Sequence, residues 1–210
     1  MKPRVAINYY KTQHLRELLF QRVYKDRVGE DHRTDFVHCL LKPFNRDIGV
    51  KPKPMDKVVE SWIIGETLHK LLQESFARKE EEYIKNGIET HIDIFWEDLP
   101  SEFKSTLSSV FMPSHVKPYL EDILSGFALI DSTKGNLITL SLTDKMLLVW
   151  DVEIKPSDIT EIKYELNNRK SLLDQARKTR NFELLTPIYE ECPYCPYNYL
   201  SGCPYGTKTS

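Results

Sequence analysis

The chain has 210 residues, with 29 lysines and arginines against 31 aspartates and glutamates, and its net charge is −2. This length suits one domain with a sizeable core, and the near-neutral charge means that any basic, nucleic-acid-binding surface must be local. No apolar stretch is long enough to span a membrane, and the first residues lack an apolar signal-peptide core. We therefore expect a cytoplasmic protein with reduced cysteines and no membrane partner.

Apolar periodicity predicts mainly helices in the first part of the chain. Residues 14–28 form an amphipathic pattern, and a short helix that starts at Thr34 or Asp35 is expected to end at Pro43. A loop over 49–54 precedes a long helix over about 56–84. Gly87 then breaks the helix, residues 88–96 alternate as a strand does, and residues 97–115 are polar with a helical middle.

The second part mixes strands and helices, so the predicted fold class is α/β (α+β). Positions 116–131 repeat at helical spacing, although 127–131 could instead be a strand after Gly126. Further along the chain, the predicted elements are a turn over 134–136, a strand over 137–142, a turn over 143–145, a strand over 146–155, and a charged, basic helix over 158–181.

The predicted strand over 146–155 carries charged residues at its polar end. Because side chains alternate across a strand, Asp151, Glu153 and Lys155 share one face. A carboxylate can hold a divalent metal, and a nearby ammonium can sit beside an attacking water or a phosphate, so Glu153 and Lys155 form the Glu-x-Lys half of a metal-dependent nuclease motif. The alternative is an edge strand with a solvated ion pair.

Phosphodiester hydrolysis needs a second carboxylate near Glu153, and three aspartates are candidates. Asp131 would lie opposite Ile154 if the hairpin turned at residues 142–143, which makes it the preferred partner. Asp144 requires a turn within the apolar run that follows it. Asp93 lies on the earlier strand.

Four cysteines point to a second metal centre. Cys192, Cys195 and Cys203 lie close together near the C-terminus, each followed by a proline, and Cys39 stands alone near the N-terminus. Four thiolates can hold zinc or an iron–sulfur cluster, and the one-plus-three layout favours the cluster over two close pairs of a zinc ribbon. Such a site would connect the tail to the N-terminal region.

Two further polar residues are individually weak candidates. His69 lies four residues after Gly65 on the predicted long helix, so both share one face. Gln175 lies on the basic helix, twenty residues after Lys155. Taken alone, a helical histidine is more often structural, and an exposed glutamine is more often solvated.

The order of these motifs resembles that of one family. A lone cysteine before Lys42-Pro43, the segment Gly65–His69, an aspartate, the segment Val152–Lys155, Gln175 and three C-terminal cysteines are similar to the RecB-like nucleases of the PD-(D/E)xK superfamily. The resemblance is strongest to the CRISPR-associated Cas-four-type exonucleases and their relatives encoded by archaeal viruses, and it runs from Thr34 to the C-terminus.

This resemblance implies one nuclease domain over 1–210, with a PD-(D/E)xK restriction-endonuclease-like core in which a mixed sheet is flanked by helices. Segments 34–48 and 187–206 would form an iron–sulfur subdomain. The implied activity is Mg²⁺- or Mn²⁺-dependent exonuclease or endonuclease cleavage of single-stranded DNA, in antiviral defence, by a homo-oligomer or a DNA-processing complex.

The resemblance also implies residue roles. His69, Asp131 and Glu153 would hold the metal, Lys155 would position the water or stabilise charge on the phosphate, and Gln175 would orient Lys155 or the DNA backbone. The four cysteines would hold a 4Fe–4S cluster.

Departures from the family pattern define the alternatives. Gly126 precedes Asp131 by five residues where the family has three, and Thr179 stands where a tyrosine is expected. The runner-up is therefore a catalytically weak or inactive subunit that binds DNA ends or single strands. A zinc-stabilised interaction domain is the third class.

Overall fold

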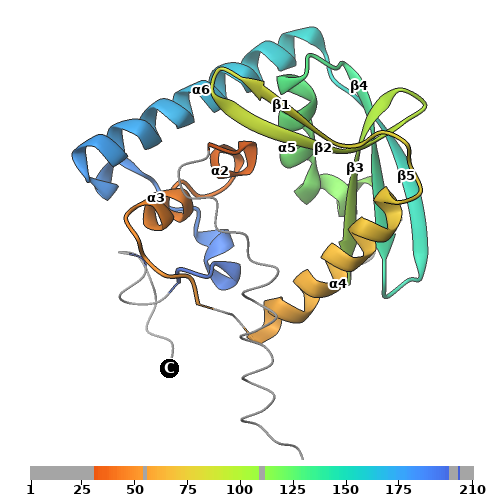
Figure 1. The fold of residues 1–210 in the computed structure, drawn as a ribbon, viewed down its shortest axis with the longest axis horizontal. Helices are drawn as coiled ribbons and strands as arrows, with labels where there is room; N and C mark the ends of the chain where they lie inside the picture. The colour runs from red at the N-terminus through yellow and green to blue at the C-terminus, as the bar shows by residue number, and fades with distance from the viewer. Residues whose placement is uncertain (1–30, 54–55, 109–111, 199–202, 204–210) are drawn as a thin grey trace, which may run out of the picture.

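The structure is a computed structural model that describes residues 31–53, 56–108, 112–198 and 203 (Figure 1). Its centre is a five-stranded sheet in the order β1-β2-β3-β4-β5. Neighbouring strands are antiparallel except for β3 and β4, because helix α5 carries the chain back between them. The strands are β1 (Lys79–Lys85), β2 (Ile88–Trp96), β3 (Leu99–Thr106), β4 (Lys134–Ser141) and β5 (Met146–Glu153).

Helices α4 (Asp56–Gln73) and α5 (Pro113–Leu129) cover opposite faces of the sheet. Leu68 and Leu72 of α4 pack against Phe103 and Ile138, whereas α5 packs against the neighbouring Leu137. Because adjacent residues of a strand point to opposite faces, this contact pattern defines three layers, helix–sheet–helix.

A second group of elements lies beside the sheet and brings together both ends of the described chain (Figure 1). Phe36, Leu41 and Leu173 are fully or almost fully buried in its core. The group consists of α2 (Arg33–Val37), α3 (Leu41–Asp47), α6 (Pro156–Thr179) and the 3₁₀ helices η1 (Phe182–Leu184) and η2 (Tyr189–Tyr194).

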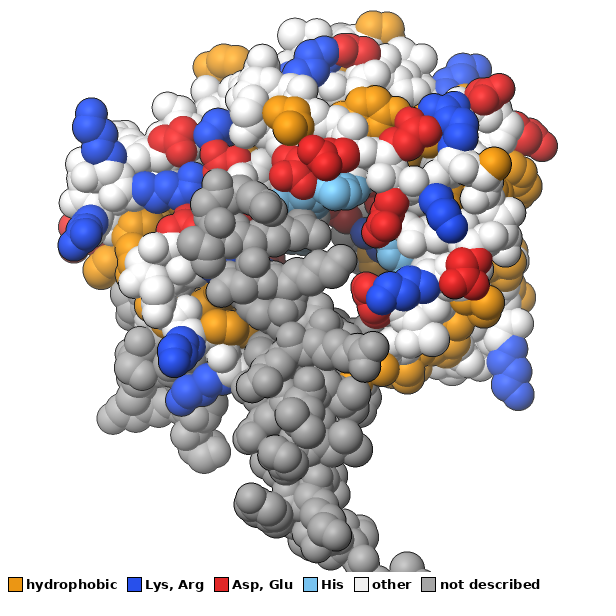
Figure 2. Space-filling view, in the orientation of Figure 1, with side chains coloured by type: hydrophobic (Ala, Val, Ile, Leu, Met, Phe, Trp, Pro, Cys, Tyr) orange, Lys and Arg blue, Asp and Glu red, His pale blue; other side chains and the backbone are white. Residues whose placement is uncertain are grey.

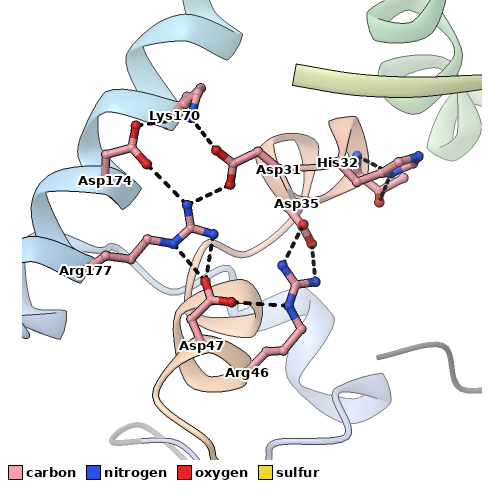
Figure 3. A network of polar contacts seen from close by, with 9 residues as sticks. Asp31, His32, Asp35, Arg46, Asp47, Lys170, Asp174 and Arg177 are labelled. Atoms are coloured by element: carbon pink, nitrogen blue, oxygen red, sulfur yellow. Dashed lines mark hydrogen bonds and ion pairs between the residues drawn. The ribbon is translucent and has the colours of Figure 1, made fainter. Parts of the chain in front are cut away.

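Ion pairs connect α6 to the chain before and after α2 (Figure 3). Arg177 donates to Asp31 at 2.6 Å and to Asp47 at 2.8 Å, and Lys170 also pairs with Asp31. Burial alone would raise the pKa of Asp31, but Lys170 and Arg177 outweigh it and lower this pKa. The segment that carries Cys39 is thereby fixed against α6.

Much of the predicted organisation is confirmed. Residues 88–96 form β2, and residues 143–145 form the turn between β4 and β5. The predicted helix over 158–181 is α6, and the competing strand over 127–131 is wrong because α5 continues to Leu129. A mixed sheet flanked by helices is confirmed as the fold class.

Several boundaries are wrong, and each has a local cause. The helix predicted over 56–84 ends at Gln73, because Asn86 and Gly87 turn residues 79–85 back along β2 as a strand. Residues 134–136, predicted as a turn, belong to β4. The strand over 146–155 ends at Glu153, and Lys155 is the N-cap of α6.

The polar stretch over 97–115 contains the central strand β3 rather than a helical middle. Glu97 and Asp98 adopt positive φ of 51° and 62°, which closes the β2–β3 hairpin with a two-residue turn.

Pro43 does not end a helix, contrary to the prediction. It lies in the first turn of α3, where an absent N–H breaks no helical bond.

Among the helices of the described ranges, none is long and apolar enough to cross a lipid bilayer. The helix predicted over 14–28 lies outside the described residues.

Candidate active site

The β2–β3 hairpin brings an aspartate, a glutamate and a lysine to one place. Asp93 lies near the end of β2, and Glu102 and Lys104 lie on β3. The Asp93 carboxylate accepts a 2.8 Å hydrogen bond from the backbone N–H of Phe103, the residue between Glu102 and Lys104. The strand pairing holds Ile94 opposite Ser101, so the Asp93 side chain bridges the two strands where they separate.

Helix α4 adds a histidine to this group. His69 Nε2 lies 3.1 Å from Asp93 Oδ1, and its ring stacks on Phe103 at a centroid distance of 6.1 Å. Gln73, one turn later, contacts both His69 Nε2 and the Asp93 carbonyl oxygen at 3.4 Å. Burial lowers the pKa of His69, but the Asp93 carboxylate outweighs burial and raises it.

Glu102 is buried, with 2% of its side chain exposed. Burial and the nearby negative charge of Asp93 raise its pKa to about 8, although Arg33 and Lys104 oppose the shift. Two neighbouring carboxylates that are shielded from solvent repel each other unless one of them is protonated or a cation binds between them. This local electrostatics is what a bound divalent metal ion would relieve.

Two cations, the buried Arg33 and the half-buried Lys104, lie beside Glu102. Arg33, the first residue of α2, lies 3.3 Å from the Glu102 carboxylate and donates to the Asp122 backbone oxygen on α5. Lys104 Nζ lies 2.8 Å from Asp122 Oδ2. Burial disfavours both charges of this pair, but their attraction outweighs it, so the pKa of Lys104 is raised and that of Asp122 is lowered. Lys104 is therefore protonated at neutral pH.

Figure 2 shows histidine and acidic side chains gathered around a hollow in one face of the molecule. One imidazole and two carboxylates are hard or borderline ligands that suit Mg²⁺ or Mn²⁺. His69, Asp93 and Glu102 could hold such an ion, with the Lys104 ammonium beside it.

The structure does not group the other predicted residues with His69. Glu153 has 72% of its side chain exposed on the edge strand β5 and pairs with Lys134 across the hairpin. Lys155 is exposed at the start of α6, and Gln175 is exposed near its end. This arrangement corresponds to the solvated edge-strand alternative.

The predicted partnership of Asp131 with Ile154 is wrong in register. The turn at 143–145 pairs Lys134 with Glu153, and the Ile154 N–H donates to the Thr133 carbonyl oxygen instead. Asp131 is exposed just after α5 and pairs with Lys85 and Lys163. Asp144 caps the same turn through Ser141 Oγ.

The four cysteines line one pocket. Cys39 lies between α2 and α3, and Cys192, Cys195 and Cys203 come from the C-terminal segment, with apolar Leu41 and Ile188 also in the wall. Glu191 fixes the two segments together, because it pairs with Lys42 and His38 and accepts from the Cys39 N–H at 3.3 Å. Glu191 thus connects the segment that carries Cys39 to the segment that carries Cys192 and Cys195.

Two thiols of this pocket, those of Cys192 and Cys195, resist ionisation when no metal is bound. Burial raises the pKa of Cys195 to about 11, and burial together with the neighbouring Cys39 and Cys203 raises that of Cys192. Thiolates at these positions need a compensating cation, which is what a metal or an iron–sulfur cluster provides.

Two solved structures have a similar fold. SSO0001 superposes with a TM-score of 0.56 at 16% identity, covering 94% of this chain and 98% of that one. LHK-Exo in complex with dAMP gives 0.51 at 10% identity, covering 80% and 97%. LHK-Exo is an alkaline exonuclease from Laribacter hongkongensis. The chain matches no family model and no curated protein sequence. At these identities the likeness shows the fold, which is nuclease-like.

Sequence reasoning missed Glu102 and Lys104, although the signal was present. They form another Glu-x-Lys, nine residues after Asp93 and separated from it by the two-residue turn. The polar character of residues 99–106 hid the strand that carries them.

Proposed function

We propose that this protein is a metal-dependent nuclease that hydrolyses phosphodiester bonds of single-stranded DNA, with His69, Asp93, Glu102 and Lys104 as its active site. The observation that carries the proposal is the meeting of Asp93 with Glu102 and Lys104 on adjacent strands. This group occurs in a fold similar to that of LHK-Exo, an alkaline exonuclease. The proposal keeps His69 and one of the three candidate aspartates, Asp93, from the sequence prediction, and it replaces Glu153 and Lys155 by Glu102 and Lys104.

The residue types present suit a divalent cation, and a shift of their side chains would be needed to bring all three ligand atoms within 4.8 Å of one another. Glu102 has its pKa raised to about 8 because it is buried beside Asp93, and a bound cation would stabilise its ionised form. His69, Asp93 and Glu102 would be its protein ligands. A bound Mg²⁺ or Mn²⁺ supplies Lewis acidity toward a phosphoryl oxygen and lowers the pKa of a bound water.

Lys104 supplies the positive charge that phosphoryl transfer requires. Its ammonium group carries a fixed proton because Asp122, 2.8 Å away, stabilises the charged form. An ammonium in this position stabilises the negative charge that develops on the phosphate and orients the attacking water by donating a hydrogen bond. Asp122 and Arg33 position Lys104 and Glu102 without contacting the substrate.

We also propose that Cys39, Cys192, Cys195 and Cys203 hold a 4Fe–4S cluster. All four line one pocket, and the one-plus-three layout, with a proline after each of the last three, agrees with the resemblance to Cas-four-type exonucleases. The cluster would be structural, joining residues 34–48 to 187–206 within a single nuclease domain. Brown protein with a broad absorption near 400 nm supports it, and colourless protein that contains stoichiometric zinc refutes it.

The chain contains a matched control for the nuclease test, because Glu-x-Lys also occurs at Glu153 and Lys155, on the exposed edge strand β5. We would measure Mn²⁺-dependent cleavage of linear and circular single-stranded DNA by anaerobically purified wild type, Glu102→Gln and Glu153→Gln. We expect Glu102→Gln to lower the rate at least about 100-fold and Glu153→Gln to leave it within about twofold, since only Glu102 lies beside a second carboxylate. Cleavage of linear DNA alone would identify an exonuclease.

Two results would contradict the proposal. If Glu153→Gln abolished cleavage and Glu102→Gln did not, the active site would lie at β5 as the sequence first suggested. If the wild type bound single-stranded DNA without cleaving it, the catalytically inactive DNA-binding subunit would be the better description.

A further inference from the structure

Three possible metal ligands lie together outside the proposed nuclease site. His32, Glu89 and His91 each offer one ligand atom, and these three atoms lie within 4.8 Å of one another. His32 is almost fully buried, with 5% exposure, and the other two are half-buried. Tetrahedral or octahedral coordination at about 2.1 Å places neighbouring ligand atoms roughly 3–3.5 Å apart, so a small adjustment of rotamers suffices.

The backbone fixes the three residues in place. His32 and Glu89 form a parallel β-bridge, and the Glu89 N–H donates to the Asp31 carbonyl oxygen at 2.8 Å. Asp31 is itself held by Lys170 and Arg177 of α6 (Figure 3). Glu89 and His91 are two apart on β2, so their side chains lie on the same face of the strand.

The His32 ring turns its Nδ1 toward Thr34. This Nδ1 accepts a hydrogen bond from the Thr34 backbone N–H at 3.3 Å and lies 2.8 Å from Thr34 Oγ1, so a cation would be bound by Nε2 on the other side of the ring. The ring centroids of His32 and His91 are 5.4 Å apart, and His91 Nε2 pairs with the Glu89 carboxylate. A cation would replace the proton that His91 and Glu89 share.

The surrounding cations are engaged by other acids. Lys170 pairs with Asp31 and with Asp174, 3.1 Å away, and Arg33 contacts Glu102 and Asp122. Lys170 and Arg33 therefore neutralise these other carboxylates and not that of Glu89. A cluster of two imidazoles and one carboxylate favours a first-row divalent cation such as Co²⁺, Ni²⁺, Fe²⁺ or Zn²⁺ over Mg²⁺, because imidazole is a softer ligand than oxygen.

We infer that His32, Glu89 and His91 form a second divalent-cation site of the two-histidine, one-carboxylate type. It borders the nuclease site on both chain segments, since His32 precedes Arg33, which contacts Glu102, and His91 precedes Asp93 by two residues on β2. Three protein ligands leave coordination positions open for water or for a phosphate oxygen. The cation site does not depend on nuclease activity.

Metal binding is best tested in a variant in which the carboxylates of the nuclease site cannot bind the cation. We would use full-length, cluster-loaded protein carrying Asp93→Asn and Glu102→Gln, and count bound Co²⁺ by equilibrium dialysis. Histidine-ring NMR would follow which imidazoles the paramagnetic Co²⁺ shifts, and single His→Gln variants would assign the signals. We expect one Co²⁺ per chain and large shifts for His32 and His91. Adding Glu89→Gln or His91→Gln should weaken binding at least about 10-fold.

His38→Gln is a matched control, because His38 also pairs with a glutamate, at 3.2 Å, and has similar exposure but belongs to no such group of three among the residues that the structure describes. It should leave the Co²⁺ affinity unchanged. Circular dichroism of each variant would establish that the fold is retained. Equal Co²⁺ affinity in the Glu89→Gln, His91→Gln and His38→Gln variants would overturn the inference, as would Co²⁺ shifts that spare His32 and His91.

Discussion

The ion pair between Lys104 and Asp122 makes a quantitative prediction in which stability and catalysis separate. Replacing Lys104 by methionine removes the ammonium group, and Asp122 keeps a buried charge whose remaining partner, Arg33, lies 3.6 Å away. Breaking a buried pair in this way costs about 3–5 kcal/mol, and we expect about 3 because Arg33 remains. Asp122→Asn should cost about 2 kcal/mol, since Glu102 still lies 3.9 Å from Lys104.

The double variant Lys104→Met with Asp122→Asn removes both charges at once. Its total cost should be about 2 kcal/mol instead of the sum of about 5, which gives a coupling energy near 3 kcal/mol. Urea unfolding of the metal-free proteins would measure these values, and Tm should fall by about 6–12 °C for Lys104→Met alone.

Cleavage of single-stranded DNA should follow a different pattern from stability. Both variants that lack Lys104 should be inactive, whereas Asp122→Asn should keep measurable activity because the ammonium group is still present. Stability costs that add to within about 0.5 kcal/mol would refute the ion-pair argument. Full activity of Lys104→Met at a temperature where it is folded would refute the role given to Lys104.

Three further predictions concern pH and packing. Because Glu102 has a pKa of about 8 without metal and the pKa of His69 is also raised, Mn²⁺ must displace protons from both ligands, so calorimetry should show an affinity that rises at least about tenfold per pH unit up to pH 8 and then levels off. The Glu191 pKa is lowered from 4.5 to about 2, since His38 and Lys42 outweigh burial, so this group contributes roughly 2–4 kcal/mol of stability that is present at pH 5 and lost by pH 2; the stability of Glu191→Gln should fall by about that much less than that of the wild type. Gly135→Ala would place a Cβ 2.5 Å from a backbone oxygen and should cost at least about 2 kcal/mol in urea unfolding, whereas Gly65→Ala, with 3.4 Å of space, should cost nothing.

The elements that sequence could predict are those with strong periodicity and ordinary surroundings. Helix α6 and strand β2 show clear helical and alternating patterns, and both are where the patterns put them. Strand β3 was missed because Ser101 and Glu102 are buried in a central strand, where patterning expects apolar residues. A functional site that buries charge contradicts the local rules by which strands are found.

The candidate site also shows what local sequence patterns can and cannot predict. The order of motifs along the chain singled out His69, which lies 3.1 Å from Asp93, and four cysteines, which line one pocket. The Glu-x-Lys pattern at Glu153 has the more strand-like sequence, yet it lies on the solvated edge. What distinguishes Glu102 is its neighbours Asp93 and Arg33, and Arg33 is 69 residues away along the chain.

Helix α2 limits how many residues the chain can have between Arg33 and Cys39. Arg33 at its first position reaches Glu102, and Cys39, two residues after its end, lines the cysteine pocket. One inserted residue in an α-helix rotates everything after it by about 100°, so an insertion between these two positions would misplace either the guanidinium or the thiol. The turn at 143–145, by contrast, carries no residue of either proposed site. Natural length variation should therefore accumulate in that turn and be excluded from the six steps between Arg33 and Cys39.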